Sequence, residues 1–154
     1  MVTTQRLHLR NFQESDILSI YNWRNDPVCF RYQRWEDTTV EEIAAYVKRF
    51  ENSRFLSTEE QQHYAVCAGE ELVGELAYFY TESDRCVTLG ITIAAGHQRK
   101  GYAREILLAV VHAVRRAYPK LDIVALIDRE NKSSIALFEK LGFKLECYAE
   151  KIGS

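Results

Sequence analysis

The order of segments along the chain predicts an α+β fold in which a mixed central β-sheet is flanked by helices. The middle of the sequence, about residues 64 to 94, contains three apolar runs at strand spacing that are separated by short polar turns. Helical spacing dominates before and after this region, and one more short run rich in β-branched residues lies between the last two helical segments. We therefore expect the helices to pack against the faces of a single sheet.

Length and composition are those of one globular domain spanning residues 1–154. A chain of 154 residues buries about two-thirds of its unfolded surface. Hydrophobic residues at 47%, charged residues at 27% and a formal charge of −2 are ordinary values that argue against general nucleic-acid binding. The polar N-terminus and the lack of an apolar run near ~18 residues predict a cytoplasmic protein without membrane contact. Monomer and homodimer both remain open.

Cysteine and histidine spacing does not favour a metal site. The four cysteines lie far apart with no C-x-x-C motif, which favours reduced core thiols, and the four histidines lack ligand spacing such as H-E-x-x-H. These residues are Cys29, Cys67, Cys86, Cys147, His8, His63, His97 and His112.

The N-terminal part begins with a predicted strand and helix. Residues 6–12 alternate, with Leu7 and Leu9 on one side, as in a half-buried strand. Ser15-Asp16 can cap a helix that ends at Asn25-Asp26-Pro27. Its apolar residues are Ile17, Leu18, Tyr21 and Trp23.

A second helix is predicted after Thr38 or Thr39. Thr39 and Glu42 have the spacing of a capping box. The expected apolar face consists of Ile43, Ala44, Val47 and Phe50. Residues 52–62 are polar and predict a mobile loop.

Three antiparallel strands follow, joined by turns at residues 69–71 and 81–85. The predicted strands are Tyr64–Ala68, Leu72–Tyr80 and Cys86–Ala94.

The C-terminal part alternates between helix and strand. The expected order is a helix over Ala103–Tyr118 before Pro119, a strand over Asp122–Ile127, a helix over Asn131–Leu141 and a strand over Phe143–Tyr148. Gly142 is suited to end the last helix.

The stretch Gln98-Arg99-Lys100-Gly101-Tyr102-Ala103 joins a strand to a strongly patterned helix and predicts a phosphate site. A helix start presents unpaired N–H groups and the positive end of its dipole, and Gly101 permits close approach of an oxygen. Arg99, Lys100 and Arg104 add positive charge. Gly96 and Gly101 have P-loop spacing, but the Lys and Ser/Thr that should follow are absent, and there is no G-x-G-x-x-G.

The same stretch resembles the pyrophosphate-binding turn Gln/Arg-x-x-Gly-x-Gly/Ala of the GCN5-related N-acetyltransferases, the GNAT family. The resemblance covers almost the whole chain and includes a similarity to ribosomal-protein N-acetyltransferases. The matching segments are Arg6-Leu7-x-Leu9-Arg10, Asn22-Trp23-Arg24-Asn25-Asp26-Pro27, Leu89-Gly90-Ile91-Thr92-Ile93, Asn131-x-x-Ser134 and Glu139-Lys140-Leu141-Gly142-Phe143. It implies the GNAT acyl-CoA fold, although relatives usually have a further strand after the Gly-Phe motif.

The resemblance implies a site for acetyl-CoA. Gln98, Arg99, Lys100, Gly101, Tyr102, Ala103 and Arg104 would cradle its pyrophosphate, mostly through backbone N–H groups. The family commonly has Gly at the position of Arg99. The backbone of Ile91 and Ile93 would pair with the pantetheine arm, and an N–H near Ile93 would hold the oxyanion.

Asn131 and Ser134 match positions that contact the cofactor arm and stabilise the leaving thiolate in relatives. Asn131 can also cap the last helix. The common pattern places a tyrosine acid where this chain has Phe138, so protonation must depend on Ser134, on water or on another tyrosine such as Tyr148.

The proposed base is Glu75, on the same strand face as Ala77 and Phe79. Its carboxylate either faces the substrate cleft, where partial burial would raise its pKa, or faces solvent. Relatives often have an acidic residue at the position of Thr88. Glu36, Glu41 and Tyr78 are weaker alternatives.

The expected function is acetyl-CoA-dependent N-acetylation of a primary amine by direct attack, since no cysteine or serine has a nucleophile signature. A peptide N-terminus or an amino sugar is the expected acceptor. The alternative is a non-catalytic CoA-binding sensor or interaction module, which the missing tyrosine at Phe138 favours.

Overall fold

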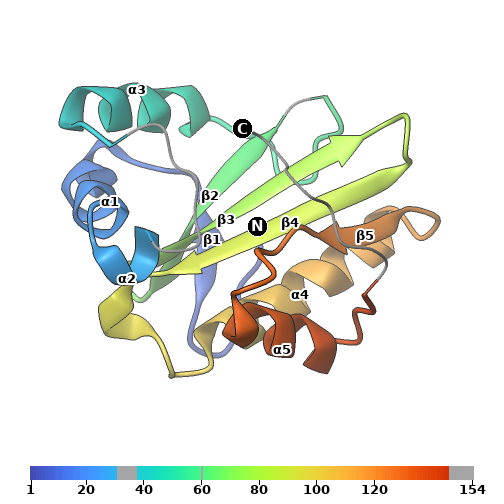
Figure 1. The fold of residues 1–154 in the computed structure, drawn as a ribbon. Helices are drawn as coiled ribbons and strands as arrows, with labels where there is room; N and C mark the ends of the chain where they lie inside the picture. Colours follow the sequence, from blue (N-terminus) through green and yellow to red (C-terminus); the bar gives the residue numbers. More distant parts are fainter. Residues whose placement is uncertain (31–37, 60, 146–154) are drawn as a thin grey trace.

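A computed structural model describes residues 1–30, 38–59 and 61–145. Within these residues the chain forms a five-stranded sheet in the order β1-β2-β3-β4-β5 (Figure 1). Neighbouring strands are antiparallel except for β4 and β5, which are parallel. This mixed sheet with flanking helices confirms the predicted fold class.

The elements follow the predicted order closely. The strands are β1 (His8–Arg10), β2 (Gln62–Ala68), β3 (Glu71–Thr81), β4 (Cys86–Ile93) and β5 (Asp122–Ala125). The helices are α1 (Ile17–Arg24), α2 (Pro27–Phe30), α3 (Val40–Phe50), α4 (Tyr102–Ala117) and α5 (Lys132–Lys140), with short 3-10 turns η1 (Glu14–Asp16) and η2 (Ala95–His97).

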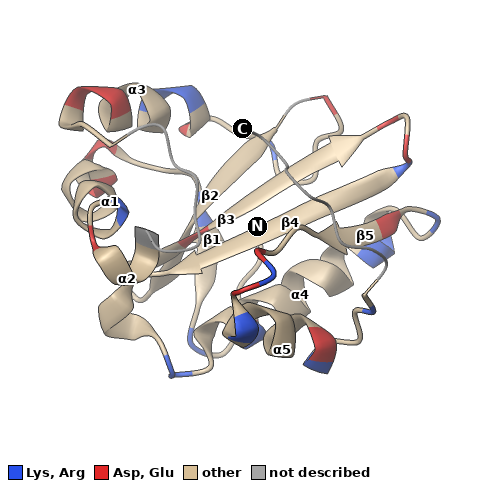
Figure 2. Ribbon diagram, viewed as in Figure 1, with Lys and Arg blue, Asp and Glu red and all other residues tan. Residues whose placement is uncertain are grey.

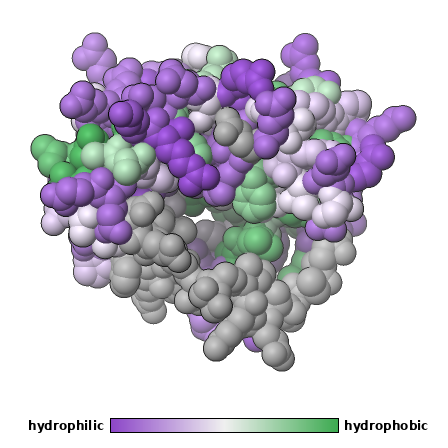
Figure 3. Space-filling model, turned by 90° about the horizontal axis from the view of Figure 1, so that it is seen from above, coloured by the Kyte–Doolittle hydropathy of each residue, from purple (hydrophilic) through white to green (hydrophobic). Residues whose placement is uncertain are grey.

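The helices cover both faces of the sheet and create two apolar cores. On one face, α4 and Phe138 of α5 pack against side chains of β1 to β4. On the other face, α1 and α3 contribute Ile20, Trp23, Ile43 and Val47, which pack against β2. From above, the described part of the surface is mostly polar, with apolar residues at the left edge and near the middle of the view (Figure 3).

The first strand and helix differ in detail from the prediction. The strand is limited to His8–Arg10, although Leu7 and Leu9 are both buried as expected. Asp16 precedes α1 but does not cap it, because its carboxylate accepts hydrogen bonds from Arg10 at 2.7 and 2.8 Å. Leu18 was wrongly predicted to belong to the apolar face, since it is 67% exposed.

Of the next two helices, α3 was predicted from its capping box and α2 was missed. The capping box of Thr39 and Glu42 is present at the start of α3. Tyr46, which was not among the predicted apolar residues, is buried on the same helix. The sequence analysis missed α2, which begins at Pro27, a residue suited to the first position of a helix.

A β-bulge in β3 determines which side chains point toward α1 and α3. Val66 lies opposite Gly74 and Cys67 lies opposite Leu72, so Val73 is the extra residue. Beyond the bulge, Leu76 and Tyr78 belong to the core beneath α4. Glu75 therefore points toward the opposite face.

The C-terminal region confirms the predicted helix but not the predicted last strand. Asn131 caps α5, and Gly142 follows it with a φ of +95°. Residues 143–145 are not in a strand, so that part of the prediction is wrong, and residues 146–148 lie outside the described residues.

Three of the four cysteines, Cys29, Cys67 and Cys86, are buried and free, and Cys147 lies outside the described residues. Burial raises the pKa of the Cys29 and Cys67 thiols. None of the helices in the described ranges is long and apolar enough to cross a bilayer.

Candidate functional site

The turn between β4 and α4 brings the predicted phosphate-binding residues together. Gly101 is the N-cap of α4 and has a φ of +78°, a left-handed conformation that glycine adopts without strain. Arg99 also has a positive φ, +65°, where a glycine would be favoured. The Gln98 side chain donates to the carbonyl of Ile93 at 2.9 Å, which ties the turn to the end of β4.

The start of α4 is suited to an anion. Gly101 has no side chain, so no side-chain cap occupies the first N–H groups of this 16-residue helix. Arg99, Lys100 and Arg104 are exposed around it, and Figure 2 shows Lys and Arg in the loop that enters α4. Backbone donors and cations thus meet at one point, as a phosphate site needs.

Among the described residues, no strand pairs with the edge of β4 beyond Leu89 that faces away from β3. The pairing of β4 with β5 ends at Leu89 and Ala125, the last residue of β5, and the chain after β5 leaves the sheet while β4 continues to Ile93 (Figure 1). The N–H of Ala94 donates to Val73 on β3, so strand alternation directs the backbone groups of Ile91 and Ile93 toward the opposite side. These backbone groups face the side of β4 on which β5 pairs with residues 86–89, beyond the end of that pairing.

A cleft of about 250 Å³ lies beside this edge. The predicted residues Glu75, Ile91, Asn131 and Ser134 line it together. The other lining residues come from β2, β3, β4, the segment after β5, and α5: His63, Ala77, Leu89, Gly90, Thr92, Leu126, Ile127, Asp128 and Phe138. Ile93 and residues 98–104 are not part of its lining: Ile93 is the last residue of β4, and residues 98–104 form the turn before α4 and the start of that helix.

Glu75 occupies the inner wall of the cleft, so the solvent-facing alternative is wrong. It is 5% exposed and accepts hydrogen bonds from Trp23 Nε1 at 3.2 Å, Arg24 Nη2 at 3.3 Å and Tyr46 Oη at 3.1 Å. The Arg24 guanidinium also lies over the Tyr46 ring, 4.1 Å from its centroid. Three donors from α1 and α3 therefore hold the carboxylate in place.

Two neighbours of Glu75 stay neutral at pH 7. Burial, followed by the charge of Glu75, raises the pKa of Tyr46. Its hydroxyl therefore stays protonated and donates a hydrogen bond to Glu75. Burial lowers the pKa of His63 to about 4, although the charge of Glu75 opposes this shift. His63 packs against the rings of Tyr46 and Phe50.

The first turn of α5 forms the outer wall of the cleft. The Asn131 side chain accepts a hydrogen bond from the Ser134 N–H at 3.2 Å, which confirms the predicted N-cap. Phe138, one turn further, is buried and packs edge-on against Phe143. Phe138 lines the cleft and stands where the family's sequence pattern has a tyrosine acid, but a phenyl ring has no proton to give.

The other proposed acids and bases are less favourably placed. Tyr78 lies in the core beneath α4, where burial raises its pKa. Glu41 is exposed on the first turn of α3. Thr88 is 7% exposed on β4, and Glu36 and Tyr148 lie outside the described residues.

The sequence analysis missed the residues that hold Glu75. Trp23 and Arg24 lie within the motif Asn22-Trp23-Arg24-Asn25-Asp26-Pro27, which was a usable signal. Tyr46 lies on another helix, and no local pattern connects it with Glu75. His63 was considered as a possible metal ligand, and its place in the lining of the cleft was missed.

Comparison with known proteins places this geometry in context. The family model "Acetyltransferase (GNAT) domain" matches residues 6–144. YnaD, an N-acetyltransferase of Bacillus subtilis (strain 168), is 23% identical over 152 residues, which are 97% of this chain and 86% of that protein.

Two solved structures share the fold. A GNAT-family acetyltransferase from Bacillus anthracis superimposes with a TM-score of 0.80 at 22% identity, covering 98% of this chain and 87% of that chain. RimL, a ribosomal L7/L12 alpha-N-protein acetyltransferase in complex with coenzyme A, has a TM-score of 0.77 at 18% identity, covering 95% of this chain and 84% of that chain.

Proposed function

Because the chain belongs to the GNAT family of acetyltransferases, we propose that it acetylates a weakly basic primary amine, such as a peptide N-terminus or an amino sugar. Acetyl-CoA-dependent N-acetylation is the activity of this family. One observation carries the proposal: Glu75, with its carboxylate, and Ser134, with its hydroxyl, line the same cleft, beside the edge of the strand β4 that leads to the turn at residues 98–104.

The residues at the turn fit the phosphate end of acetyl-CoA. Gly101 leaves the first N–H groups of α4 available, and three cations surround it. Bound acetyl-CoA supplies an acetyl group activated as a thioester. In our proposal the backbone of Ile91 and Ile93 orients the pantetheine arm along the edge of β4.

Glu75 is the proposed proton acceptor for the amine. Its carboxylate lines the cleft, and three donors take up most of its acceptor capacity. Ser134 Oγ is the proposed donor to the sulfur that leaves, and Asn131 holds the backbone of that helical turn. Proton transfer in this arrangement depends on a firmly held carboxylate and one hydroxyl.

The acceptor ranking follows from proton arithmetic. An amine with a pKa of about 10.4 is neutral in only about 1 molecule in 2,500 at pH 7, a deficit near 4.6 kcal/mol. An α-amine with a pKa near 7.8 has a deficit of only about 1.1 kcal/mol. The positive charge of Arg24 makes the carboxylate of Glu75 a weaker base. Such a base is better suited to the α-amine, which needs less help to lose its proton.

The direct test is release of CoA thiol from acetyl-CoA in the presence of peptides with free N-termini, amino sugars and spermidine. We expect turnover with a peptide or an amino sugar. Binding of acetyl-CoA without thiol release on any amine would instead support the sensor module, which Phe138 in the cleft favours.

Replacing Gly101 by Val is expected to abolish the thermal stabilisation of the protein by acetyl-CoA. A ligand at 100 times its Kd adds about 2.7 kcal/mol to the free energy of unfolding. A β-branched residue is strained at a φ of +78° and obstructs the approach to the turn. Differential scanning fluorimetry measures the shift, with Gly96→Val as control because a Cβ there has open space. An unchanged shift in the Gly101 variant would place the cofactor elsewhere.

Replacing Ser134 by Ala is expected to lower turnover about 10- to 100-fold with little change in acetyl-CoA affinity. The proposed hydrogen bond strengthens only as charge develops on the sulfur, and bonds to charged groups contribute about 1.5 to 3 kcal/mol. Ser133→Ala, at an exposed position of the same helix, is the matched control. Equal losses of turnover and affinity would reassign Ser134 to binding.

A further inference from the structure

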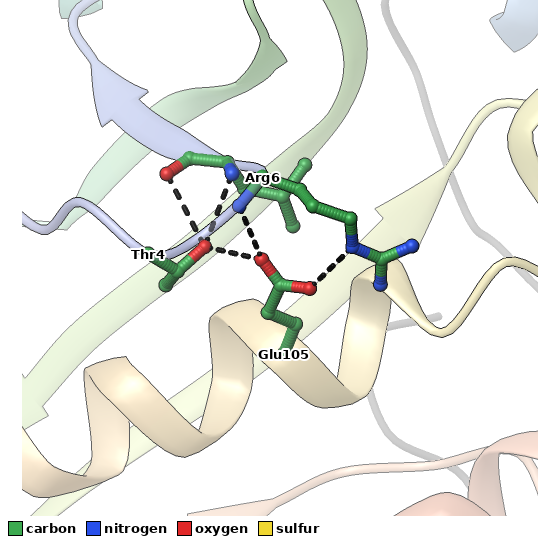
Figure 4. Close-up of polar contacts among 4 residues, drawn as sticks. Thr4, Arg6 and Glu105 are labelled. Carbon is green, nitrogen blue, oxygen red and sulfur yellow. Dashed lines mark hydrogen bonds and ion pairs between the residues drawn. The ribbon is translucent and has the colours of Figure 1, made fainter.

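The N-terminal arm of the chain reaches the phosphate turn. Leu9 N donates to Val2 O at 2.9 Å and Thr4 N donates to Leu7 O at 2.7 Å, so residues 2–9 form a compact turn. Leu7 anchors this turn in the core. The arm thereby places Thr4 and Arg6 against the first turn of α4 (Figure 4).

Glu105 is the contact point on α4. Its carboxylate accepts hydrogen bonds from Thr4 Oγ1, from the Arg6 N–H at 2.9 Å and from Arg6 Nε at 2.7 Å (Figure 4). The Thr4 hydroxyl and then the Arg6 contacts lower the pKa of Glu105. An acidic residue in this turn would repel a phosphate, and the guanidinium of Arg6 compensates its charge.

The rest of the Arg6 guanidinium is directed toward the turn. Nη2 lies 3.5 Å from the point that a Cβ on Gly101 would occupy, and Cζ lies 4.7 Å from the centroid of the Tyr102 ring. The side chain is 44% exposed. The two terminal nitrogens point away from Glu105 in Figure 4. Neither of them donates to a residue in the described part of the chain.

We propose that Arg6 is a phosphate-binding residue of the acetyl-CoA site, with its terminal nitrogens donating to phosphate oxygens of the nucleotide end. The proposal rests on the proposed function. Glu105 and Tyr102 hold the guanidinium in place before the ligand arrives, which reduces the side-chain entropy lost on binding. Two parallel donors match the geometry of phosphate oxygens, as lysine does not.

A purely structural role is the competing explanation, in which the ion pair of Arg6 and Glu105 only fastens the N-terminal arm to α4. The two explanations predict different affinities of an Arg6 variant for CoA and for its fragments. Phosphate binding affects ligands that carry phosphate at the nucleotide end, whereas a loosened helix start would also weaken pantetheine binding.

The test is isothermal titration of Arg6→Gln with CoA, dephospho-CoA and pantetheine at low and high salt. We expect a loss of CoA affinity of about 10-fold or more at low salt, smaller at high salt, with pantetheine binding unchanged. Arg6→Lys keeps the positive charge but lacks the two parallel donors of the guanidinium, so it should recover only part of the CoA affinity. A loss that persists with dephospho-CoA identifies the pyrophosphate as the partner, and a loss that disappears identifies the 3′-phosphate.

Arg54→Gln is the matched control because it removes the same charge from another exposed ion pair, with Glu59. The loop that contains Arg54 contacts Tyr118, just after the C-terminal end of α4. The length of this helix, about 24 Å, separates that contact from the turn at Gly101. CoA affinity in Arg6→Gln equal to that of the unmodified protein, or an equal loss for pantetheine, would overturn the inference alone. No CoA binding by the unmodified protein would overturn the proposed function and the inference with it.

Discussion

Replacing Gly74 by Ala is expected to lower the free energy of unfolding by about 3 kcal/mol or more. A Cβ at this position would collide with the backbone carbonyl oxygen of Thr92 and would lie 3.2 Å from the Cα of Ile93. Both obstacles belong to β4, which cannot move without disturbing its pairing with β3. The strain therefore has no flexible side chain to absorb it.

The measurement is urea denaturation of the apo protein, and the control is Gly90→Ala. Gly90 lies on the neighbouring strand, where an added Cβ would be 3.7 Å from the Cβ of Ala77, an ordinary contact. We expect the control to unfold within about 1 kcal/mol of the parent. Equal stability of the two variants would show that the strands separate more readily than their packing indicates.

Elements with strong local signals were predictable from the sequence. The three central strands and α4 have clear periodicity, and their observed ends differ from the predicted ends by at most two residues. The capping box of α3 and the Asn131 cap of α5 depend on residues three positions apart. The turn at residues 98–104 could be located for the same reason, because it consists of seven consecutive residues, whereas its binding of phosphate stays a prediction.

Contacts between distant segments were not predictable. Glu75 is held from two helices that lie 51 and 29 residues away in the chain, and Arg6 contacts Glu105 across 99 residues. The bulge at Val73 was also missed, although Gly74 inside the strand was a usable signal for it, and the bulge decides which face Glu75 occupies. Such features depend on how the layers pack, which one-dimensional periodicity does not encode.

The surroundings of Glu75 limit what this carboxylate can do. It forms a buried ion pair with Arg24, and removing one partner of such a pair leaves an uncompensated charge. Glu75→Gln should therefore lower the free energy of unfolding by about 3 kcal/mol or more, independently of any catalytic role. A second variant is needed to separate stability from chemistry. Arg24→Met combined with Glu75→Gln removes both charges and is expected to recover much of the stability.

Turnover of a peptide α-amine should fall about 100-fold or more in Glu75→Gln and remain low in the double variant, because a positioned proton acceptor contributes about 10²- to 10⁴-fold. Glu70→Gln, at the exposed turn before β3, is the matched control and should retain full activity. Acetyl transfer to peptides, amino sugars and spermidine at several pH values measures the effect. In the parent, activity on the peptide should level off above about pH 8.5, where an α-amine with a pKa near 7.8 is mostly neutral, whereas spermidine should require a higher pH. Preferred turnover of spermidine at neutral pH, with Glu75→Gln still active, would overturn both the acceptor ranking and the proposed proton acceptor.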